Sequence, residues 1–143
     1  MRVHAPLWSS LALSFIGCGS QPIAPTAPTA PDNVGLVQEL SSANFAAVAL
    51  SGQGVVMVEF YRATCPYCQA MVPTVQQVAQ DFAGRAIVAR VETTQEPGLA
   101  SAWGISGVPT FVFFRAGKEV RRFVGSTSPQ VLEGLLDQTL NGS

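Results

Sequence analysis

Two cysteines separated by two residues have the clearest capacity for chemistry in this chain. Cys65 and Cys68 enclose Pro66 and Tyr67, directly after the apolar run of residues 55–61. Two thiols one helical turn apart can close a small disulfide that reopens easily, and the amino-terminal end of a helix stabilises a thiolate over a thiol. Where a buried strand passes into a helix, this spacing indicates redox chemistry.

A static disulfide and one half of a zinc site would use the same spacing, so the other ligands of the chain matter. Structural zinc takes four cysteine or histidine ligands, and a copper carrier also needs further soft ligands. The chain has three cysteines and one histidine, and both Cys18 and His4 stand near its start. The same shortage excludes a nucleophile activated by histidine. We therefore expect redox chemistry by the pair, with no metal and no cofactor.

Residues 1–17 are typical of a signal peptide. Arg2 precedes an apolar stretch, residues 5–16, which has the length of a signal-peptide core and is too short to span a bilayer comfortably. The segment that ends at Cys18 is similar to a bacterial lipobox, in which the cysteine is lipidated and becomes the mature N-terminus. Ordinary cleavage near Gly19 is the alternative. We expect an exported protein on the periplasmic side, anchored to a bacterial membrane by a lipid on Cys18.

Residues 18–35 continue from the lipidation site as a tether rich in Pro, Ala and Thr. Proline recurs at every third position from Pro22 to Pro31, which favours an extended polyproline II conformation and excludes a packed element. At about 3.1 Å per residue, the tether could hold the rest of the chain up to roughly 50 Å from a membrane. Residues 36–143 are enough for one domain with its own core, and not for two.

The charge of the chain argues against nucleic acid as a partner. The formal net charge is −1, from eight basic and nine acidic side chains, and no basic stripe stands out. No dimerisation module accompanies the globular part, so we expect a monomer.

A sheet and its covering helices must position the cysteine pair. Apolar runs and periodicities predict, in order, a helix over 42–50, a strand over 55–61, a helix from the cysteine pair to about 82, a strand over 86–91, a short helix over 97–103, strands over 110–114 and 119–124, and a last helix from 129. The apolar side of the last helix is predicted to consist of Val131, Leu132, Leu135, Leu136 and Leu140. Ser128 is expected to cap this helix. The order β-α-β followed by β-β-α predicts an α/β fold with helices on both faces of a central sheet.

A second motif, Gly107-Val108-Pro109-Thr110, stands just before the predicted hairpin. Together with the cysteine pair after the central strand, it makes residues 36–141 similar to thioredoxins. The resemblance covers essentially the whole globular part and implies a thioredoxin fold with a mixed central sheet. It also implies a cis peptide bond before Pro109, which would present the backbone of Val108 to an extended substrate segment and keep metal ions off the thiols.

The resemblance implies a role for each thiol and for one acid. Cys65 would be the exposed nucleophile that attacks a substrate disulfide, and Cys68 the buried thiol that resolves the mixed disulfide and pairs with Cys65. Glu59 stands at the place of the buried acid of the family, where burial would raise its pKa and suit it to accept the proton of Cys68. A glutamate on an edge strand that faces water is the alternative. Arg90 falls where the family has a cation that can pair with this acid, and a solvated arginine is the alternative there.

The resemblance also implies a flat docking face for substrates around the sulfur. Pro66 and Tyr67 lie between the cysteines on one side of this face. Gly107, Val108 and Pro109 would form the other side.

Three departures from the usual thioredoxin pattern concern this face. Thr64 stands where thioredoxins usually have Trp, Thr93 replaces an apolar contact residue, and Pro66-Tyr67 replaces the usual Gly-Pro. The first two changes make the face less apolar. The residues between the cysteines tune thiolate stability and redox poise, so the direction of electron transfer stays open.

These features predict an exported thiol–disulfide oxidoreductase that reduces protein disulfides. Its partners would be client proteins with disulfides or dithiols, and a membrane thiol–disulfide protein that donates or accepts electrons. An oxidant or isomerase is the first alternative. A binding module without turnover is the second, and the joint presence of Cys65, Cys68, Glu59 and Pro109 argues against it.

Overall fold

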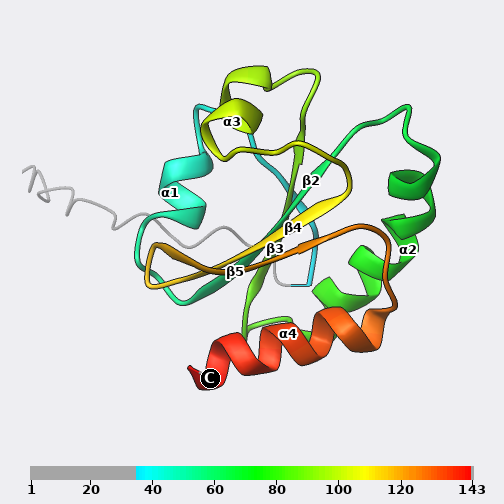
Figure 1. Ribbon diagram of the computed structural model, residues 1–143. Coiled ribbons are helices and arrows are strands. Elements are labelled where there is room, and N and C mark those ends of the chain that lie inside the picture. The colour runs from blue at the N-terminus through cyan, green and yellow to red at the C-terminus, as the bar shows by residue number, and fades with distance from the viewer. Residues whose placement is uncertain (1–34, 143) are drawn as a thin grey trace, which may run out of the picture. The chain divides into compact units, whose positions relative to one another are not determined.

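A computed structural model describes residues 35–142 of the chain (Figure 1). The predicted signal peptide 1–17, the lipidation site Cys18 and the tether up to residue 34 lie outside the described residues, and these assignments stay predictions.

Within residues 35–142 the chain forms one mixed sheet and four helices. The strands are β1 (Gln38–Glu39), β2 (Val55–Tyr61), β3 (Ile87–Glu92), β4 (Thr110–Arg115) and β5 (Lys118–Val124), and the helices are α1 (Phe45–Ala49), α2 (Pro66–Asp81), α3 (Pro97–Ala102) and α4 (Pro129–Asn141). The strand order is β1-β3-β2-β4-β5. None of the described helices has the length and apolar character needed to cross a membrane.

Strand β2 lies in the centre of the sheet, which explains its apolar sequence. It pairs in parallel with β3 and antiparallel with β4, and its first six residues are buried. A strand that is covered on both faces shows such a continuous apolar run instead of alternation. Glu59 therefore belongs to a central strand, and the alternative of an edge-strand glutamate facing water is wrong.

Two apolar cores lie on the two faces of the sheet. Side chains alternate along β2, so Met57 and Val58 point to opposite faces. Met57 packs in a cluster with residues of α2 and α4, among them Leu132. Val58 packs in the other cluster with Phe45 of α1 and with Trp103, which follows α3. Figure 1 shows the same division, with α2 and α4 on one side and α1 and α3 on the other, as the predicted α/β fold requires.

The hairpin between β4 and β5 turns at Ala116 and Gly117, where the sequence predicts a turn. Both residues have positive φ, 50° and 75°. A Cβ atom at Gly117 would lie 2.6 Å from the carbonyl oxygen of Leu50, so glycine is required here by backbone approach as well as by conformation.

Two predictions at the amino-terminal end of the fold need correction. The first helix begins at Phe45 and not at residue 42, because residues 41–44 form a turn in which the side chain of Asn44 accepts a hydrogen bond of 2.7 Å from the backbone N–H of Ser41. Strand β1 was not predicted. It has two residues and is held by parallel pairing with Ala89 and Arg90 of β3.

The last helix also differs from its prediction in one side chain and one cap. Leu132 and Leu136 are fully buried, but Val131 is 41% exposed and Thr139 is buried in its place. Ser128 occupies the cap position without a side-chain cap hydrogen bond.

Candidate active site

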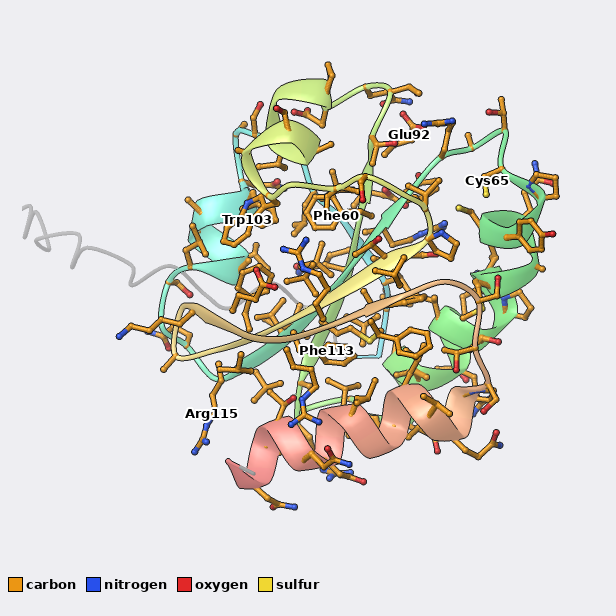
Figure 2. All side chains as sticks on the ribbon, viewed as in Figure 1. Phe60, Cys65, Glu92, Trp103, Phe113 and Arg115 are labelled. Carbon is orange, nitrogen blue, oxygen red and sulfur yellow. The ribbon has the colours of Figure 1, made fainter. Side chains whose placement is uncertain are left out.

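The cysteine pair lies at the first turn of α2, directly after the loop that leaves β2. Cys65 is the N-cap residue, and Pro66 occupies the first turn, where its missing N–H costs no hydrogen bond. The backbone N–H of Cys68 donates to the sulfur of Cys65 over 3.4 Å. Cys65 is partly exposed at one end of the sheet (Figure 2), whereas Cys68 is buried.

The two thiols differ in acidity in the direction that their predicted roles require. The pKa of Cys65 is lowered, above all by hydrogen bonds from the side chain and backbone of Cys68, then by the backbone of Tyr67 and least by the charge of Arg62. Burial raises the pKa of Cys68 to about 11. Cys65 is therefore the thiol that ionises first and can attack, and Cys68 keeps its proton until a base removes it.

The loop before β4 brings a second group of predicted residues to the sulfur. The Val108–Pro109 peptide bond is cis, as the resemblance implied, and the carbonyl oxygen of Val108 lies 3.9 Å from the sulfur of Cys65. The hydroxyl of Thr110 donates to the carbonyl of Gly107 over 2.7 Å and holds this loop against the start of β4.

On the other side of the sulfur the two residues between the cysteines face solvent. Pro66 is exposed, and Tyr67 is 69% exposed. Val124, at the end of β5, is 61% exposed and adds an apolar side chain near the same end of the sheet. The fold thus places Pro66, Tyr67, Val108 and Pro109 around one accessible sulfur.

Glu59 is a fully buried carboxylic acid of the central strand, and its charge acts on the buried thiol Cys68. One of its oxygens accepts a hydrogen bond of 3.0 Å from Nε of Arg90, and the other, Oε1, has no hydrogen-bond partner among residues 35–142. Burial raises its pKa from 4.5 to about 7, although Arg90 acts in the opposite direction. The charge of Glu59 in turn contributes to the raised pKa of Cys68, so the two groups influence each other.

Arg90 links this buried acid to the surface of the protein. Its guanidinium lies 3.8 Å from the centre of the Tyr61 ring and 3.9 Å from the carboxylate of Glu39, and its side chain is 14% exposed. The hydroxyl of Tyr61 donates to the same carboxylate of Glu39 over 3.3 Å. The predicted pairing of Arg90 with Glu59 is confirmed, and the alternative of a solvated arginine is wrong. Glu39 was missed because it belongs to the unpredicted strand β1.

Glu92 is a second buried carboxylate that the sequence analysis did not identify. It accepts hydrogen bonds from the backbone N–H of Ala63 at 3.2 Å, from the backbone N–H of Gln95 at 2.7 Å and from the hydroxyl of Thr94 at 2.5 Å. Its pKa is lowered, with the Thr94 hydroxyl as the largest cause. Glu92 thus fastens the loop that carries Cys65 to the end of β3 (Figure 2). The sequence pattern that could have identified Glu92 is a glutamate at the end of a buried strand, followed by three polar residues.

The arrangement provides the parts of a thiol–disulfide exchange. A partly exposed sulfur of lowered pKa lies beside a buried thiol, and a buried acid with a pKa of about 7 acts on that thiol through its charge. Residues 35–142 contain no group of three or more His, Cys, Asp or Glu side chains that could hold a metal ion.

Comparisons with known proteins agree on one family. The thioredoxin family model matches residues 36–138. Thioredoxin 2 of Chlorobaculum tepidum is 31% identical over 100 residues, which make up 70% of this chain and 92% of that protein. A thioredoxin of Synechocystis is 29% identical over 71% of this chain and 95% of its own length, and a chloroplastic M-type thioredoxin of Zea mays is 28% identical over 70% of this chain and 60% of its own.

Proposed function

This chain belongs to the thioredoxin family and is a thiol–disulfide oxidoreductase, and from this premise we propose that it reduces disulfides of client proteins through Cys65 and Cys68. The observation that carries the proposal is the pairing of an accessible sulfur of lowered pKa with a buried thiol 3 residues later.

The reaction proceeds in two exchanges. The thiolate of Cys65 attacks one sulfur of a client disulfide, a new disulfide joins Cys65 to that sulfur, and the other client sulfur leaves as a thiolate. Cys68 then loses its proton and attacks the sulfur of Cys65, which releases the second client thiolate. The client gains two electrons and becomes a dithiol, and Cys65 and Cys68 become a disulfide.

Glu59 is the proposed acceptor of the Cys68 proton. A thiol with a pKa of about 11 is a poor nucleophile at neutral pH, so the second exchange needs a base. Glu59 has a pKa of about 7 and an oxygen, Oε1, without a hydrogen-bond partner within residues 35–142. In Glu59→Gln we expect the second exchange to slow by about a hundredfold, while the first attack changes little. Rapid-quench detection of the mixed disulfide separates the two steps, and an unchanged second step would remove Glu59 from the mechanism.

The similarity to thioredoxins and the modest stabilisation of the Cys65 thiolate support reduction as the direction. The proteins to which the chain is similar are named thioredoxins. A strong oxidant stabilises its thiolate far more than a thioredoxin does. Here the one cation that lowers the pKa of Cys65, Arg62, is the weakest contributor. The dipeptide Pro66-Tyr67 favours the second candidate, an oxidant or isomerase, because it departs from the usual thioredoxin pair.

The reduction potential of the Cys65–Cys68 pair tests the direction. Equilibration of the full chain with glutathione buffers should give a value near about −270 mV for a reductant, and a value near about −120 mV would mean a disulfide-forming oxidant. A chain that reduces no protein disulfide at any potential would instead be a binding module.

The proposed setting is the periplasmic side of a bacterial membrane. It is supported by the signal-peptide pattern of residues 1–17 and by the lipobox-like segment at Cys18. There the oxidised pair would be reduced again by a membrane thiol–disulfide electron donor, and the protein would act as a monomer. Expression of the full chain in a bacterium, with Cys18→Ala as the control, should give a lipid-modified N-terminal peptide by mass spectrometry from the native sequence alone. A native protein cleaved near Gly19 would contradict the anchor.

A further inference from the structure

A polar hollow opens beside the reactive sulfur, next to Gly107 and Val108 of the docking face, and the two exchanges described above do not use it. It has a volume of about 330 Å³ and lies between the end of β3, the helix α3 and the loop that leads to Pro109. Its lining residues come from four separate segments and include Arg62, Thr93, Thr94, Ser101 and Val108. Because the carbonyl of Val108 lies 3.9 Å from the sulfur of Cys65, a polypeptide held at that sulfur passes the mouth of the hollow.

The hollow carries positive charge and hydroxyl groups, and no acidic side chain lines it. Arg62 is exposed and forms no ion pair within residues 35–142. Its charge also reaches Cys65, whose pKa it helps to lower, so the guanidinium lies on the same side of the molecule as the sulfur. A free cation next to a substrate path favours a client group of negative charge.

Thr93 supplies a hydroxyl that lacks a partner. Its oxygen is buried and makes no hydrogen bond with any described residue, which is unfavourable for a polar atom away from water. The neighbouring Thr94 differs, because its hydroxyl is already bound to Glu92. Thr93 lines the hollow, so its unpaired hydroxyl is available to an acceptor that enters there.

A second hollow nearby has the opposite character. It is lined by the carboxylates of Glu39, Glu92 and Glu96, together with residues of β1, β2 and the β3–α3 loop. A client carboxylate would be repelled by this second hollow and attracted to the hollow of Arg62. The two hollows therefore carry opposite charges at this end of the sheet.

From this arrangement we propose that the hollow lined by Arg62 and Thr93 binds an acidic side chain of the client, next to the cysteine that Cys65 attacks. The inference rests on the proposed function, since the occupant belongs to a client disulfide. The client carboxylate pairs with the guanidinium of Arg62 and accepts a hydrogen bond from the hydroxyl of Thr93. The pair of residues thus selects which client disulfides react fastest.

Synthetic peptides that differ in one residue test the inference. Each peptide carries one cysteine in a disulfide with 2-mercaptoethanol, and Asp, Asn or Lys stands at one of the two positions before or after that cysteine. The rate of reduction by the dithiol form of the full chain is divided by the rate with free 2-mercaptoethanol, which removes the effect of the neighbour on the intrinsic reactivity of the disulfide. At the position that reaches the hollow, the Asp peptide should react about three- to tenfold faster than the Asn peptide, and the Lys peptide slower than both.

Three variants assign this preference to the hollow. In Arg62→Gln the ratio of the Asp to the Asn rate should fall to about one, whatever the change in the absolute rates through the pKa of Cys65. In Thr93→Val, which keeps the shape of the side chain, the ratio should fall in part. Arg115→Gln is the matched control, because Arg115 stands at the other end of β4 and far from Cys65 (Figure 2), and it should keep the native ratio.

The outcomes separate this inference from the proposed function. Equal normalised rates for Asp and Asn at every position, or a ratio that Arg62→Gln leaves intact, would overturn the acidic subsite while the reductase activity stands. An unchanged ratio in Thr93→Val would contradict the part given to the hydroxyl. A chain that reduces none of the peptides would overturn the proposed function, and the inference with it.

Discussion

At the scale of single residues, the site depends on two thiols that differ in exposure and acidity. Cys65 is partly exposed with a lowered pKa, and Cys68 is buried with a pKa of about 11. This difference assigns one step to each thiol. The accessible thiolate of Cys65 attacks the client disulfide, and Cys68 resolves the mixed disulfide after a base removes its proton.

Serine variants of the two thiols should therefore behave differently. Cys68→Ser keeps the nucleophile and removes the resolving thiol, so mixed disulfides with clients should accumulate. Cys65→Ser should accumulate none, because the remaining thiol is buried and protonated. Non-reducing gel electrophoresis after an acid quench measures both. Equal amounts of mixed disulfide from the two variants would contradict the assigned roles.

The buried acid makes stability depend on pH in a direction opposite to that of most surface carboxylates. The pKa of Glu59 is about 7 in the folded protein, whereas an exposed glutamate has a pKa of about 4.5. Between these values the unfolded chain releases the proton while the folded chain keeps it, so the free energy of unfolding falls as pH rises. A difference of about 2.5 pH units corresponds to a fall of about 3 kcal/mol, complete near pH 7, and the full contribution is present below pH 4.5.

Glu59→Gln should abolish this fall, because glutamine does not titrate. Urea denaturation of the dithiol form at a series of pH values from 4 to 8 measures the slope, with Glu133→Gln on α4 as a control that should keep it. A slope that persists in Glu59→Gln would mean that another group carries it.

At the scale of elements, the loop before α2 is held by a side chain from a neighbouring strand. Glu92, at the end of β3, accepts a hydrogen bond from Ala63 with one carboxylate oxygen. With the other oxygen it accepts hydrogen bonds from Thr94 and Gln95 in the turn after β3. In Glu92→Gln the amide group meets N–H donors on at least one side, which leaves a buried donor without an acceptor. The variant should lose about 1–3 kcal/mol of unfolding free energy, and the amide of Ala63 should exchange its proton faster.

Two measurements check this prediction. Urea denaturation gives the loss of stability, and hydrogen exchange followed by NMR gives the protection of Ala63. Glu133→Gln, at a partly exposed position of α4, should change neither. Native protection of Ala63 in Glu92→Gln would show that the loop does not need this anchor.

The elements also show why part of the fold and of the site could be predicted. Strand β2 and the β4–β5 hairpin have local signals, a continuous apolar run and a turn at Ala116-Gly117, and their bounds agree with the prediction to within about one residue. Strand β1 has no such signal. Gln38 and Glu39 are polar, and they form a strand because β3 lies beside them, which is a contact between residues far apart in the chain.

The difference between local signals and contacts across the chain also explains which site residues could be predicted from the sequence. The cysteines, Glu59 and Pro109 belong to local motifs, whereas Glu39, Glu92 and the hollow of Arg62 arise from segments that meet through folding. Spacing along the chain identifies the reacting atoms, and the surrounding contacts depend on three-dimensional packing.

At the scale of the whole molecule, the sheet divides the interior into two cores that share the central strand. The core between the sheet and α4 includes the fully buried Leu132 and Leu136, whereas Val131 of the same helix faces solvent. Leu136→Ala should therefore cost about 2–5 kcal/mol of unfolding free energy, and Val131→Ala should change it by less than about 0.5 kcal/mol.

Denaturant unfolding of the two variants measures this contrast. Because small domains unfold as one unit, the loss in Leu136→Ala should appear equally when unfolding is followed in either core. Similar losses in the two variants, or a transition confined to one core, would contradict the shared cooperative structure.

The other core contains an optical reporter. Of the two tryptophans of the chain, Trp8 stands in the predicted signal peptide, and Trp103 packs against Phe45 at 5.5 Å and edge-on against Phe114 at 5.1 Å between ring centres. Trp103 lies on the face of the sheet that α1 and α3 cover, apart from Cys65 at the start of α2 (Figure 2), and it is the only tryptophan among residues 35–142. Fluorescence of Trp103 should thus follow the packing of this core more closely than the oxidation state of the thiols, so unfolding and redox change can be recorded as separate signals in one sample.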